Sequence, residues 1–509
     1  MCGIIGFISP RRSIGLSEEI TRMVCKLSHR GPDRQAVWTD DIVGLALGHS
    51  RLAIQDISPA GNQPMVSDSG NFVIIFNGEI YNHLDLRNVL ISENKKIDWK
   101  GTSDTETLLA CVEAWGLDIT LKRCSGMFAL ALWDKCRKIL TIARDRLGEK
   151  PLYYGWQGES FIFGSELKPF KENNDFIGDI DREALALYVR FNYVPAPFSI
   201  YKDIKKLPAG TYLELHFDGV HKSAPVVDVP ISYWSLAETA DKASRSRFQG
   251  NDEELVNELD KLLIHTVASQ MLSDVPLGAF LSGGVDSSTI VSMMQACSKT
   301  PVNTFTIGFE EQGYNEAENG KLIASHLGTN HTELYISSED ARNVIPLIPT
   351  LYDEPFADSS QIPTYLVSKL ASQHVKVALT GDGGDELFGG YNRHLWLGKL
   401  WRNIDRSPRF ISSTLGRGLS SVSPEVWDAV FNKTKQLLPE YYRVSQFGNK
   451  MHKLGDLLSS STVNEMYGRV RSFWNNEHIV IANKNKSERN SFSSSDNILR
   501  SGMEIEEQI

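Results

Sequence analysis

The strongest constraint on how this chain folds is the stretch 277–296, where a short apolar run meets a turn of glycines and serines. The apolar run predicts a buried strand, and the recurrence of Ile290, Met293 and Met294 after the turn predicts a helix. Glycines let a ligand approach the backbone closely, and amide groups at the start of a helix attract an anion. The stretch therefore predicts a phosphate-binding loop between a strand and a helix.

Three serines and one carboxylate give this loop further donors and a metal ligand. Asp286 stands where a carboxylate holds the magnesium that accompanies a polyphosphate. The loop lacks the lysine of the Gly-x-x-x-x-Gly-Lys-Ser/Thr pattern, so it is a different kind of phosphate loop. An ordinary Ser/Gly turn is the alternative interpretation. The residues expected to surround the polyphosphate are Ser282, Gly283, Gly284, Asp286, Ser287 and Ser288.

From residue 251 onward, predicted strands and helices alternate, which implies a mainly parallel sheet. The expected elements occupy residues 253–270, 303–309, 316–327, 331–335, 362–373 and 375–379. The last strand runs into a glycine-rich acidic loop, 380–391, at the edge where open α/β sheets bind ligands. We therefore expect Asp286 and Asp385 to hold magnesium there. A further acidic cluster, 353–360, either faces the same cleft or starts a helix.

Length and composition limit the class of protein. A chain of 509 residues exceeds the size at which single cores stop growing, about 250–300 residues, so more than one domain is expected. Its 41% hydrophobic and 23% charged residues are typical of a soluble globular protein. A net charge of −10, spread along the chain, argues against binding to nucleic acid or anionic membranes. Without a membrane-spanning run or secretory signal, we expect a cytoplasmic protein whose cysteines are buried free thiols.

Cys2 is a candidate nucleophile, because it becomes the N-terminal residue if Met1 is removed. Its thiol and its α-amine then belong to one residue. An α-amine with a pKa of about 7.7–8.0 can act as the base that activates the adjacent thiol. The predicted strand 4–8 would present this residue to a substrate.

Polar residues follow several predicted elements of the first half. Arg51 stands at the end of an apolar strand, and Asn77 with Gly78 follows the buried strand 72–76. An amide side chain and a backbone N–H at a strand end are what an oxyanion hole needs. Ser103 caps the predicted helix 107–115, which leaves Asp104 to meet an ammonium group. Taken singly, these features are also explained by a surface ion pair, a hairpin turn and a helix cap.

In this order after Cys2, these motifs resemble the glutaminase domain of class II glutamine amidotransferases, over residues 2 to about 210. The resemblance implies an N-terminal-nucleophile hydrolase with a four-layer αββα fold. It implies that Cys2 attacks the side-chain amide of glutamine. The other implied roles are oxyanion binding by Asn77 and Gly78, α-carboxylate binding by Arg51, and α-amine binding by Glu79 and Asp104.

The motifs of the second half resemble the ATP-pyrophosphatase half of glutamine-hydrolysing asparagine synthetases, which implies a Rossmann-like parallel sheet. In that family Leu281 and Ile307 would line the adenine pocket, and Thr380 with Gly381 would lie along the nucleotide. Asp382 would face the activated carboxylate. The implied reaction is adenylation of a carboxylate by ATP with Mg²⁺, followed by attack of ammonia that a channel delivers from the first domain.

The combined expectation is an α/β and α+β chain of two domains: a glutaminase at 2–215, a connection at 216–250 and an ATP-binding domain at 251–509. Relatives normally continue past this point with a Leu-Pro-Asp-Asp stretch and a later lysine, so the second domain is expected to be incomplete. A helical region is expected at 395–442, and disorder at 482–501.

The function expected from the resemblance is an enzyme of amino-acid biosynthesis that converts aspartate to asparagine with glutamine and ATP. Its expected partners are these small molecules, with no nucleic acid or membrane, and a homodimer is left open. One alternative is amidation of another carboxylate, such as a sugar acid. Another is a glutaminase or nucleotide-binding module with an inactive synthetase half.

Overall fold

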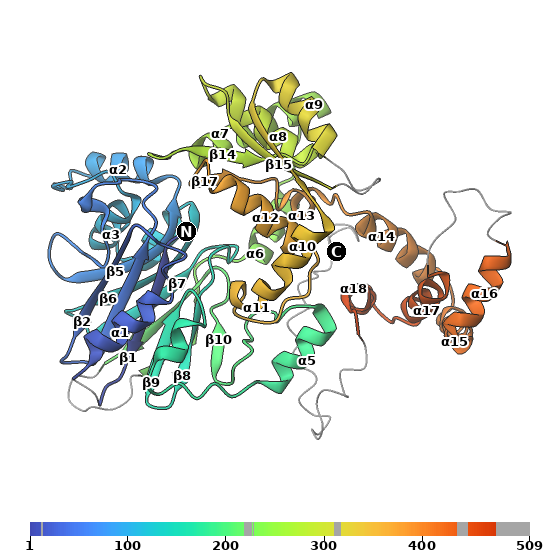
Figure 1. The fold of residues 1–509 in the computed structure, drawn as a ribbon, viewed down its shortest axis with the longest axis horizontal. Helices are drawn as coiled ribbons and strands as arrows, with labels where there is room; N and C mark the ends of the chain where they lie inside the picture. The colour runs from blue at the N-terminus through green and yellow to red at the C-terminus, as the bar shows by residue number, and fades with distance from the viewer. Residues whose placement is uncertain (12–13, 218–225, 228, 310–316, 435–445, 475–509) are drawn as a thin grey trace. The chain divides into compact units, whose positions relative to one another are not determined.

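The computed structural model describes residues 1–11, 14–217, 226–227, 229–309, 317–434 and 446–474. Its contacts divide the chain into two units (Figure 1). The first comprises Met1–Leu185 with Tyr193–Gly381, and the second comprises Ala186–Asn192 with Asp382–Ile509. The first unit contains the predicted glutaminase residues and the phosphate loop, so most of the predicted site residues can be examined within it.

Two antiparallel sheets form the N-terminal part of the first unit. The first sheet has the order β10 (Ile204–Lys206), β8 (Tyr153–Gln157), β9 (Ser160–Gly164), β1 (Gly3–Ile8), β3 (Leu45–Arg51) and β2 (Arg34–Asp40). The second has the order β12 (Val226–Val227), β11 (Thr211–His216), β7 (Ile139–Arg144), β6 (Gly126–Asp134), β5 (Phe72–Ile80) and β4 (Met65–Val66). A further short strand, β13 (Ile231–Ser232), pairs with β11.

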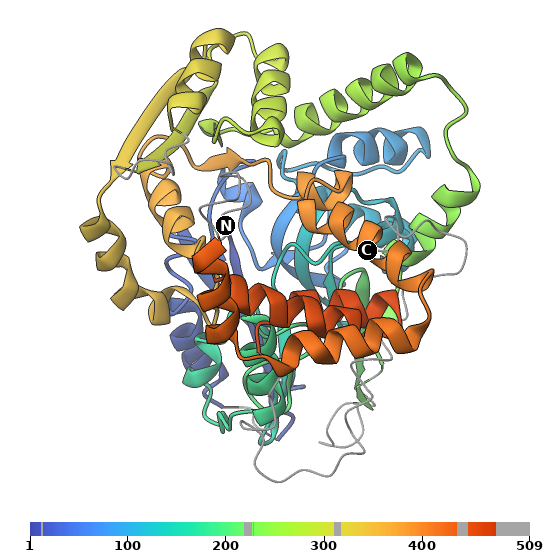
Figure 2. The same ribbon diagram turned by 90° about the vertical axis from the view of Figure 1, so that its right-hand side faces the viewer.

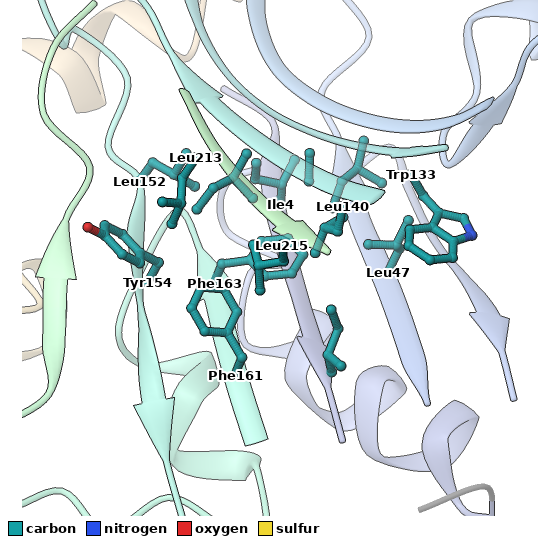
Figure 3. Packing of buried hydrophobic residues seen from close by; sticks show 14 of the residues in the cluster. Ile4, Leu47, Trp133, Leu140, Leu152, Tyr154, Phe161, Phe163, Leu213 and Leu215 are labelled. Carbon is teal, nitrogen blue, oxygen red and sulfur yellow. The ribbon is translucent and has the colours of Figure 1, made fainter. Parts of the chain in front are cut away.

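Strand β5 shows why its sheet packs against another layer on each of its two faces. Val73 and Ile75 belong to the core cluster between the sheets, whereas Ile74 and Phe76 belong to the cluster on the helical side. Neighbouring side chains of a strand point to opposite faces, so four consecutive apolar residues require two cores. Figure 3 shows the inner cluster, in which side chains such as Phe163 of β9 and Leu140 of β7 pack between the sheets.

Helices cover the outer faces. Helix α2 (His83–Ser92), helix α3 (Asp104–Trp115) and helix α4 (Leu117–Arg123) supply apolar residues to the outer cluster of the second sheet. Helix α1 (Leu16–Cys25) lies over the first sheet (Figure 1). There Gly48 permits close packing, because a Cβ at that position would lie 2.2 Å from the Cγ2 atom of Val24. The layers are helix, sheet, sheet and helix, which confirms the predicted αββα arrangement.

The rest of the first unit is built on a parallel sheet with the order β16 (Asn330–Ile336), β15 (Asn303–Phe309), β14 (Leu277–Phe280) and β17 (Val377–Leu379). One core cluster joins it to α7 (Asp252–Gln270), α8 (Val285–Cys297) and α9 (Ala317–Leu327). A second cluster joins Phe305 to α12 (Gln361–Ala371). This Rossmann-like arrangement was predicted from the alternation of strands and helices.

The predicted connection 216–250 contains the strand pairings of β12 and β13 and the helix α6 (Leu236–Arg245). One expectation, about the cysteines, was wrong. The cysteines are free, as expected, but Cys25, Cys136 and Cys297 are exposed rather than buried. Burial of a cysteine depends on the face that its element turns to the core, and the spacing of cysteines carries no such information.

The second unit is helical in its described residues. The helix α5 (Arg182–Phe191) crosses into it, and the others are α13 (Gly384–Phe388), α14 (Asn392–Asp405), α15 (Arg409–Ser421), α16 (Pro424–Thr434), α17 (Phe447–Leu458) and α18 (Val463–Arg471). Figure 2 shows the orange and red helices running alongside one another, and α15 and α17 are in contact. The predicted helical region 395–442 is confirmed as far as Thr434.

The segment 482–501, for which disorder was predicted, lies outside the described residues. Among the helices of the described ranges, none is long and apolar enough to cross a membrane.

Candidate active site

Cys2 lies just before β1, beside Leu52, the residue that follows β3. The backbone N–H of Leu52 donates to the Cys2 thiol at 3.4 Å. Burial raises the pKa of the Cys2 thiol, and burial also lowers the pKa of the N-terminal amine, here that of Met1, to about 6. Near neutral pH this environment therefore favours a neutral amine beside a protonated thiol, the pairing that proton transfer from thiol to amine requires.

Asn77 and Gly78 lie inside strand β5, not at its end. The strand pairs with β6 from Phe72 to Ile80, so the prediction that it ends at Phe76 was wrong. The Asn77 side chain is 1% exposed and its Nδ2 donates to Ser165 Oγ at 3.5 Å. Its buried Oδ1 atom has no hydrogen-bond partner among the described residues. At Gly78 a Cβ would lie 2.1 Å from the carbonyl oxygen of Met127, so only glycine fits beside β6.

Arg51 ends strand β3, as predicted, and three oxygen acceptors of the segment 56–62 hold its guanidinium. One terminal nitrogen donates to the carbonyl oxygen of Ser58 at 3.0 Å and to Asn62 Oδ1 at 2.8 Å. The other donates to the carbonyl oxygen of Asp56. These acceptors fix the plane of the guanidinium, which suits it to a planar carboxylate.

Two buried carboxylates lie near the N-terminus of the chain. Asp104 accepts a hydrogen bond from the backbone N–H of Ile80 at 2.9 Å, and it begins helix α3 behind the predicted cap Ser103. Burial, reinforced by the charge of Asp104, raises the pKa of Glu79 to about 7. Burial also raises the pKa of Asp104. A cation bound between these carboxylates would offset the unfavourable free energy of holding two negative charges in a buried place. The pair therefore suits an ammonium group.

Arg144 and Asp145 have structural roles. Arg144 donates to the carbonyl oxygens of Gly148, Lys150 and Leu207 at 2.6–2.7 Å. The buried carboxylate of Asp145 accepts backbone N–H groups at 2.9–3.1 Å from the loop that follows it and from β6. Together they fix the loop 145–150 beside the site.

The predicted phosphate loop joins β14 to α8. Gly283 has a φ of 83°, and a Cβ there would lie 2.7 Å from the Cβ of Asn319. Ser282 Oγ accepts from the backbone N–H of Gly284 at 3.3 Å and contacts Ser287 Oγ at 3.0 Å. These hydrogen bonds stabilise the turn that leads directly into the first residues of α8. The helix has 13 residues, long enough for its dipole to favour an anion there.

The strand order places this loop where an open sheet binds ligands. In chain order the strands run 3-2-1-4, so the direction of winding reverses between β14 and β17. Ligands bind at such a switch point, beyond the carboxyl ends of the strands. Gly381, just after β17, approaches the start of α8 so closely that a Cβ would lie 2.7 Å from the backbone nitrogen of Ser287. Leu281 continues from β14, and Ile307 lies on the adjacent β15.

The predicted magnesium ligands are divided between the two units. Asp286, in the first turn of α8, is half-buried beside the phosphate loop. Asp382 and Asp385 belong to the second unit, Asp385 in α13. The described residues contain no group of three or more His, Cys, Asp or Glu side chains arranged to hold a metal. Magnesium that accompanies a nucleotide needs only one or two carboxylates besides the phosphates, so Asp286 fits that chemistry.

The acidic cluster 353–360 does not act as one group. Asp353 and Glu354 pair with Lys168 and Lys206 of the N-terminal part. Asp358 accepts from the backbone N–H of Ser360 at 2.8 Å, just before α12. The second part therefore starts a helix, which was one of the two interpretations of this cluster. The ion pairs of the first part were not foreseen, because partners some 150–185 residues apart leave no local pattern in the sequence.

Comparison with protein families divides the chain in two. Residues 1–225 match the model of a glutamine amidotransferase domain, and residues 258–500 match that of an asparagine synthase. The chain is 36% identical over 467 residues to a candidate glutamine-hydrolysing asparagine synthetase of Methanocaldococcus jannaschii, covering 87% of this chain and 85% of that protein.

It is also 38% identical over 395 residues to asparagine synthetase [glutamine-hydrolyzing] 1 of Bacillus subtilis, covering 77% of this chain and 59% of that protein. Among solved structures, the glutamine phosphoribosylpyrophosphate amidotransferase of B. subtilis with ADP and GMP matches with 13% identity and a TM-score of 0.33. It covers 66% of this chain and 81% of that one, and at this score it carries no conclusion.

Proposed function

Because the chain belongs to the family of glutamine-hydrolysing asparagine synthetases, we propose that it makes asparagine from aspartate, glutamine and ATP. The observation that supports the proposal is that one compact unit contains two separate groups of predicted site residues. The first group surrounds Cys2, just before β1, and the second consists of two glycine-containing loops at the switch point of a parallel sheet. A glutaminase alone would need only the first.

In the proposed glutaminase step, the thiol of Cys2 passes its proton to the α-amine and attacks the side-chain amide carbon of glutamine. The oxyanion forms beside the Asn77 amide and the Gly78 N–H, and the leaving nitrogen departs as ammonia. Arg51 binds the α-carboxylate, and Glu79 with Asp104 binds the α-ammonium. Water then releases glutamate from the thioester.

In the proposed synthetase step, the loop of Ser282, Gly283, Gly284, Ser287 and Ser288 holds the pyrophosphate part of ATP at the start of α8. The adenine lies against Leu281 and Ile307, with Thr380 and Gly381 along the nucleotide. The acceptor carboxylate attacks the α-phosphorus, pyrophosphate leaves, and ammonia displaces AMP from the acyl-adenylate, which Asp382 faces. Magnesium, held by Asp286 and Asp385, would neutralise charge on the phosphates.

The test separates the two half-reactions. The purified chain is incubated with ATP, Mg²⁺ and aspartate, either with glutamine or with ammonium chloride, and glutamate, pyrophosphate, AMP and asparagine are measured. We expect all four products with glutamine, and all but glutamate with ammonium. Glutamate release without AMP or asparagine under either nitrogen source would reject the synthetase function and leave a glutaminase.

The acceptor is tested in the same assay. Aspartate rests on the family alone, and no described pocket residue distinguishes it from another carboxylate. Replacing aspartate by glutamate or by a sugar acid should remove AMP formation. AMP formed only with a different acid would keep the reaction class and change the substrate.

A further inference from the structure

The segment that follows strand β9 lies against the proposed glutaminase site. The backbone N–H of Ser165 donates to the carbonyl oxygen of Ile4 at 2.9 Å, and its hydroxyl accepts from the N–H of Ile4 at 3.1 Å. The same hydroxyl is the partner of the Asn77 amide. Ser165 is completely buried. The segment is therefore fixed to the strand that carries Cys2 and to the proposed oxyanion hole.

The next residue, Glu166, contacts two basic side chains, one of which also contacts Cys2. Its carboxylate accepts from His29 Nε2 and from Arg30, each at 2.9 Å, and Arg30 Nε donates to the carbonyl oxygen of Cys2 at 3.0 Å. Burial by itself would raise the pKa of Glu166. The hydrogen bond from His29 and the charge of Arg30 outweigh it and lower the pKa to about 2. Glu166 is thus an anion at every physiological pH.

Lys168 connects this anion to the synthetase half. Its ammonium lies 3.0 Å from Glu166 Oε2 and 3.1 Å from Asp353 Oδ1, and its backbone N–H donates to the same Asp353 oxygen at 3.2 Å. Burial, together with the charge of Glu166, raises the pKa of Asp353, so these two carboxylates oppose each other. Of these two carboxylates, Arg30 and His29 contact Glu166 alone, whereas Lys168 contacts both and so offsets the repulsion between them.

The adjacent residue, Glu354, is anchored to the same half. Its carboxylate pairs with Lys206 at 2.5 Å, accepts from the backbone N–H of Ile200 at 2.8 Å and contacts the Tyr153 hydroxyl at 3.4 Å. Asp353 and Glu354 lie between α11 (Ile348–Leu351) and α12, so they tie one segment of the synthetase half to the glutaminase half.

This junction borders a cavity of about 380 Å³ whose walls come from both halves. On one side are Arg30, Ser165 and Glu166, which touch the proposed glutaminase site, and on the other are residues 351–356. The cavity therefore lies between residues that contact the proposed glutaminase site and a segment of the synthetase half.

We propose that Lys168 is a positioning residue for the transfer of ammonia between the half-reactions: by bridging Glu166 and Asp353 it holds residues 352–356 against the glutaminase site. The proposal rests on the proposed function. Without this cation the two buried carboxylates repel each other, the walls of the cavity separate, and ammonia escapes into solvent. Neither half-reaction contains Lys168 in its own site, so each continues separately.

The experiment uses the full chain with Lys168→Met, which removes the charge and keeps the apolar stem. Three quantities are measured: glutamate release from glutamine, asparagine formed from ammonium, and asparagine formed per glutamate when glutamine is the nitrogen source. Free ammonium is measured in the same reactions. The matched control is Lys202→Met, which removes an exposed lysine that pairs with Asp179 at 3.4 Å and, among the described residues, forms no ion pair with Glu166 or Asp353.

We expect Lys168→Met to keep the first two quantities within about twofold. The asparagine-to-glutamate ratio should fall by about tenfold, with free ammonium rising in step, because ammonia in bulk water loses its high effective concentration. Lys168→Arg, which keeps the charge, should restore most of the ratio. Lys202→Met should behave as the wild type.

An unchanged ratio in Lys168→Met would overturn the proposal, and so would a proportional loss of all three quantities, which marks a merely structural lysine. If Lys168→Met does not fold, as judged by circular dichroism, Lys168→Gln, which also removes the charge but keeps a hydrogen-bond donor, replaces it and must show the same loss of ratio. Failure of the wild type to form asparagine even from ammonium would instead reject the proposed function. The two failures are therefore distinguishable.

Discussion

The two halves of the first unit differ in where their predicted site residues lie. In one half they lie within a strand, and in the other they lie in loops that follow strands. Asn77 and Gly78 of the glutaminase half lie inside β5, where ladder hydrogen bonds and two apolar cores hold them. In the synthetase half the predicted nucleotide site consists of the loops after β14 and β17, where Ser282 and Gly284 are exposed. The first arrangement gives fixed, dry polar groups, and the second gives backbone amides that a large anion can reach.

This difference predicts which substitutions each half tolerates. A site of buried side chains should be most sensitive to loss of a functional group, since nothing nearby can replace it. A site of backbone amides should be most sensitive to an added Cβ where two loops meet. The predictions below test that contrast, beginning with the largest effect.

Cys2→Ala should abolish glutamate release, a loss of about 10³-fold or more, because the nucleophile has no substitute. Asparagine formation from ammonium should remain within about twofold, since the nucleotide loops do not depend on the thiol. The measurement is the pair of product assays described above. Glutamine hydrolysis at the wild-type rate in this variant would show that the nucleophile is another residue.

Gly381→Ala should weaken ATP binding by about tenfold, which corresponds to about 1.4 kcal/mol. Its Cβ would lie 2.7 Å from the backbone nitrogen of Ser287, so the loop after β17 must move away from the start of α8. Titration calorimetry with ATP and Mg²⁺ measures the effect. The control is Gly418→Ala on α15, where a Cβ meets no atom within 4 Å. Equal ATP affinity in both variants would contradict the assigned position of the nucleotide.

Glu79→Gln tests the buried carboxylate through pH. The folded protein holds this carboxyl at a pKa of about 7 instead of 4.5, so folding favours its protonated form. The contribution of this protonated carboxyl to the free energy of unfolding is complete below about pH 4.5 and is lost as pH rises through about 7. The variant should therefore match the wild type near pH 4.5 and be more stable near pH 8, by up to about 3 kcal/mol.

Urea unfolding at both pH values measures this difference, and Glu113→Gln on the exposed face of α3 is the control. If Glu79 also binds the glutamine ammonium, the variant's KM for glutamine should lose its decrease between about pH 6 and pH 8. A stability difference that is the same at both pH values would contradict the assigned pKa.

The smallest effect is expected for Lys376→Met, at a second contact between the halves. Lys376 lies 3.0 Å from Asp33, but its side chain is 41% exposed and that of Asp33 is 33% exposed. Exposed pairs contribute about 0–1 kcal/mol, so stability and the asparagine-to-glutamate ratio should hardly change. A loss of ratio as large as that of Lys168→Met would show that any contact between the halves matters, not the buried bridge in particular.

The sequence by itself determined many of the local elements, and it supplied the residues of the proposed site. The glycine-serine turn before α8, the candidate nucleophile Cys2, the cap of α3 and the alternation of strands with helices follow from spacing and side-chain chemistry over a few residues. The predicted strand 303–309 coincides with β15, and the capped helix begins within three residues of its predicted start. Short-range patterns suffice there because turns, caps and apolar periodicity are set by neighbours in the chain.

Only the tertiary structure decided what depends on distant partners. Asn77 and Gly78 continue a strand because β6 supplies hydrogen bonds along its whole length. Asp353 and Glu354 meet lysines of the other half, which their own acidic surroundings in the sequence do not indicate. A carboxylate pairs with whichever cation the fold brings within about 4 Å, and over 185 residues only the packing of sheets and helices fixes that choice.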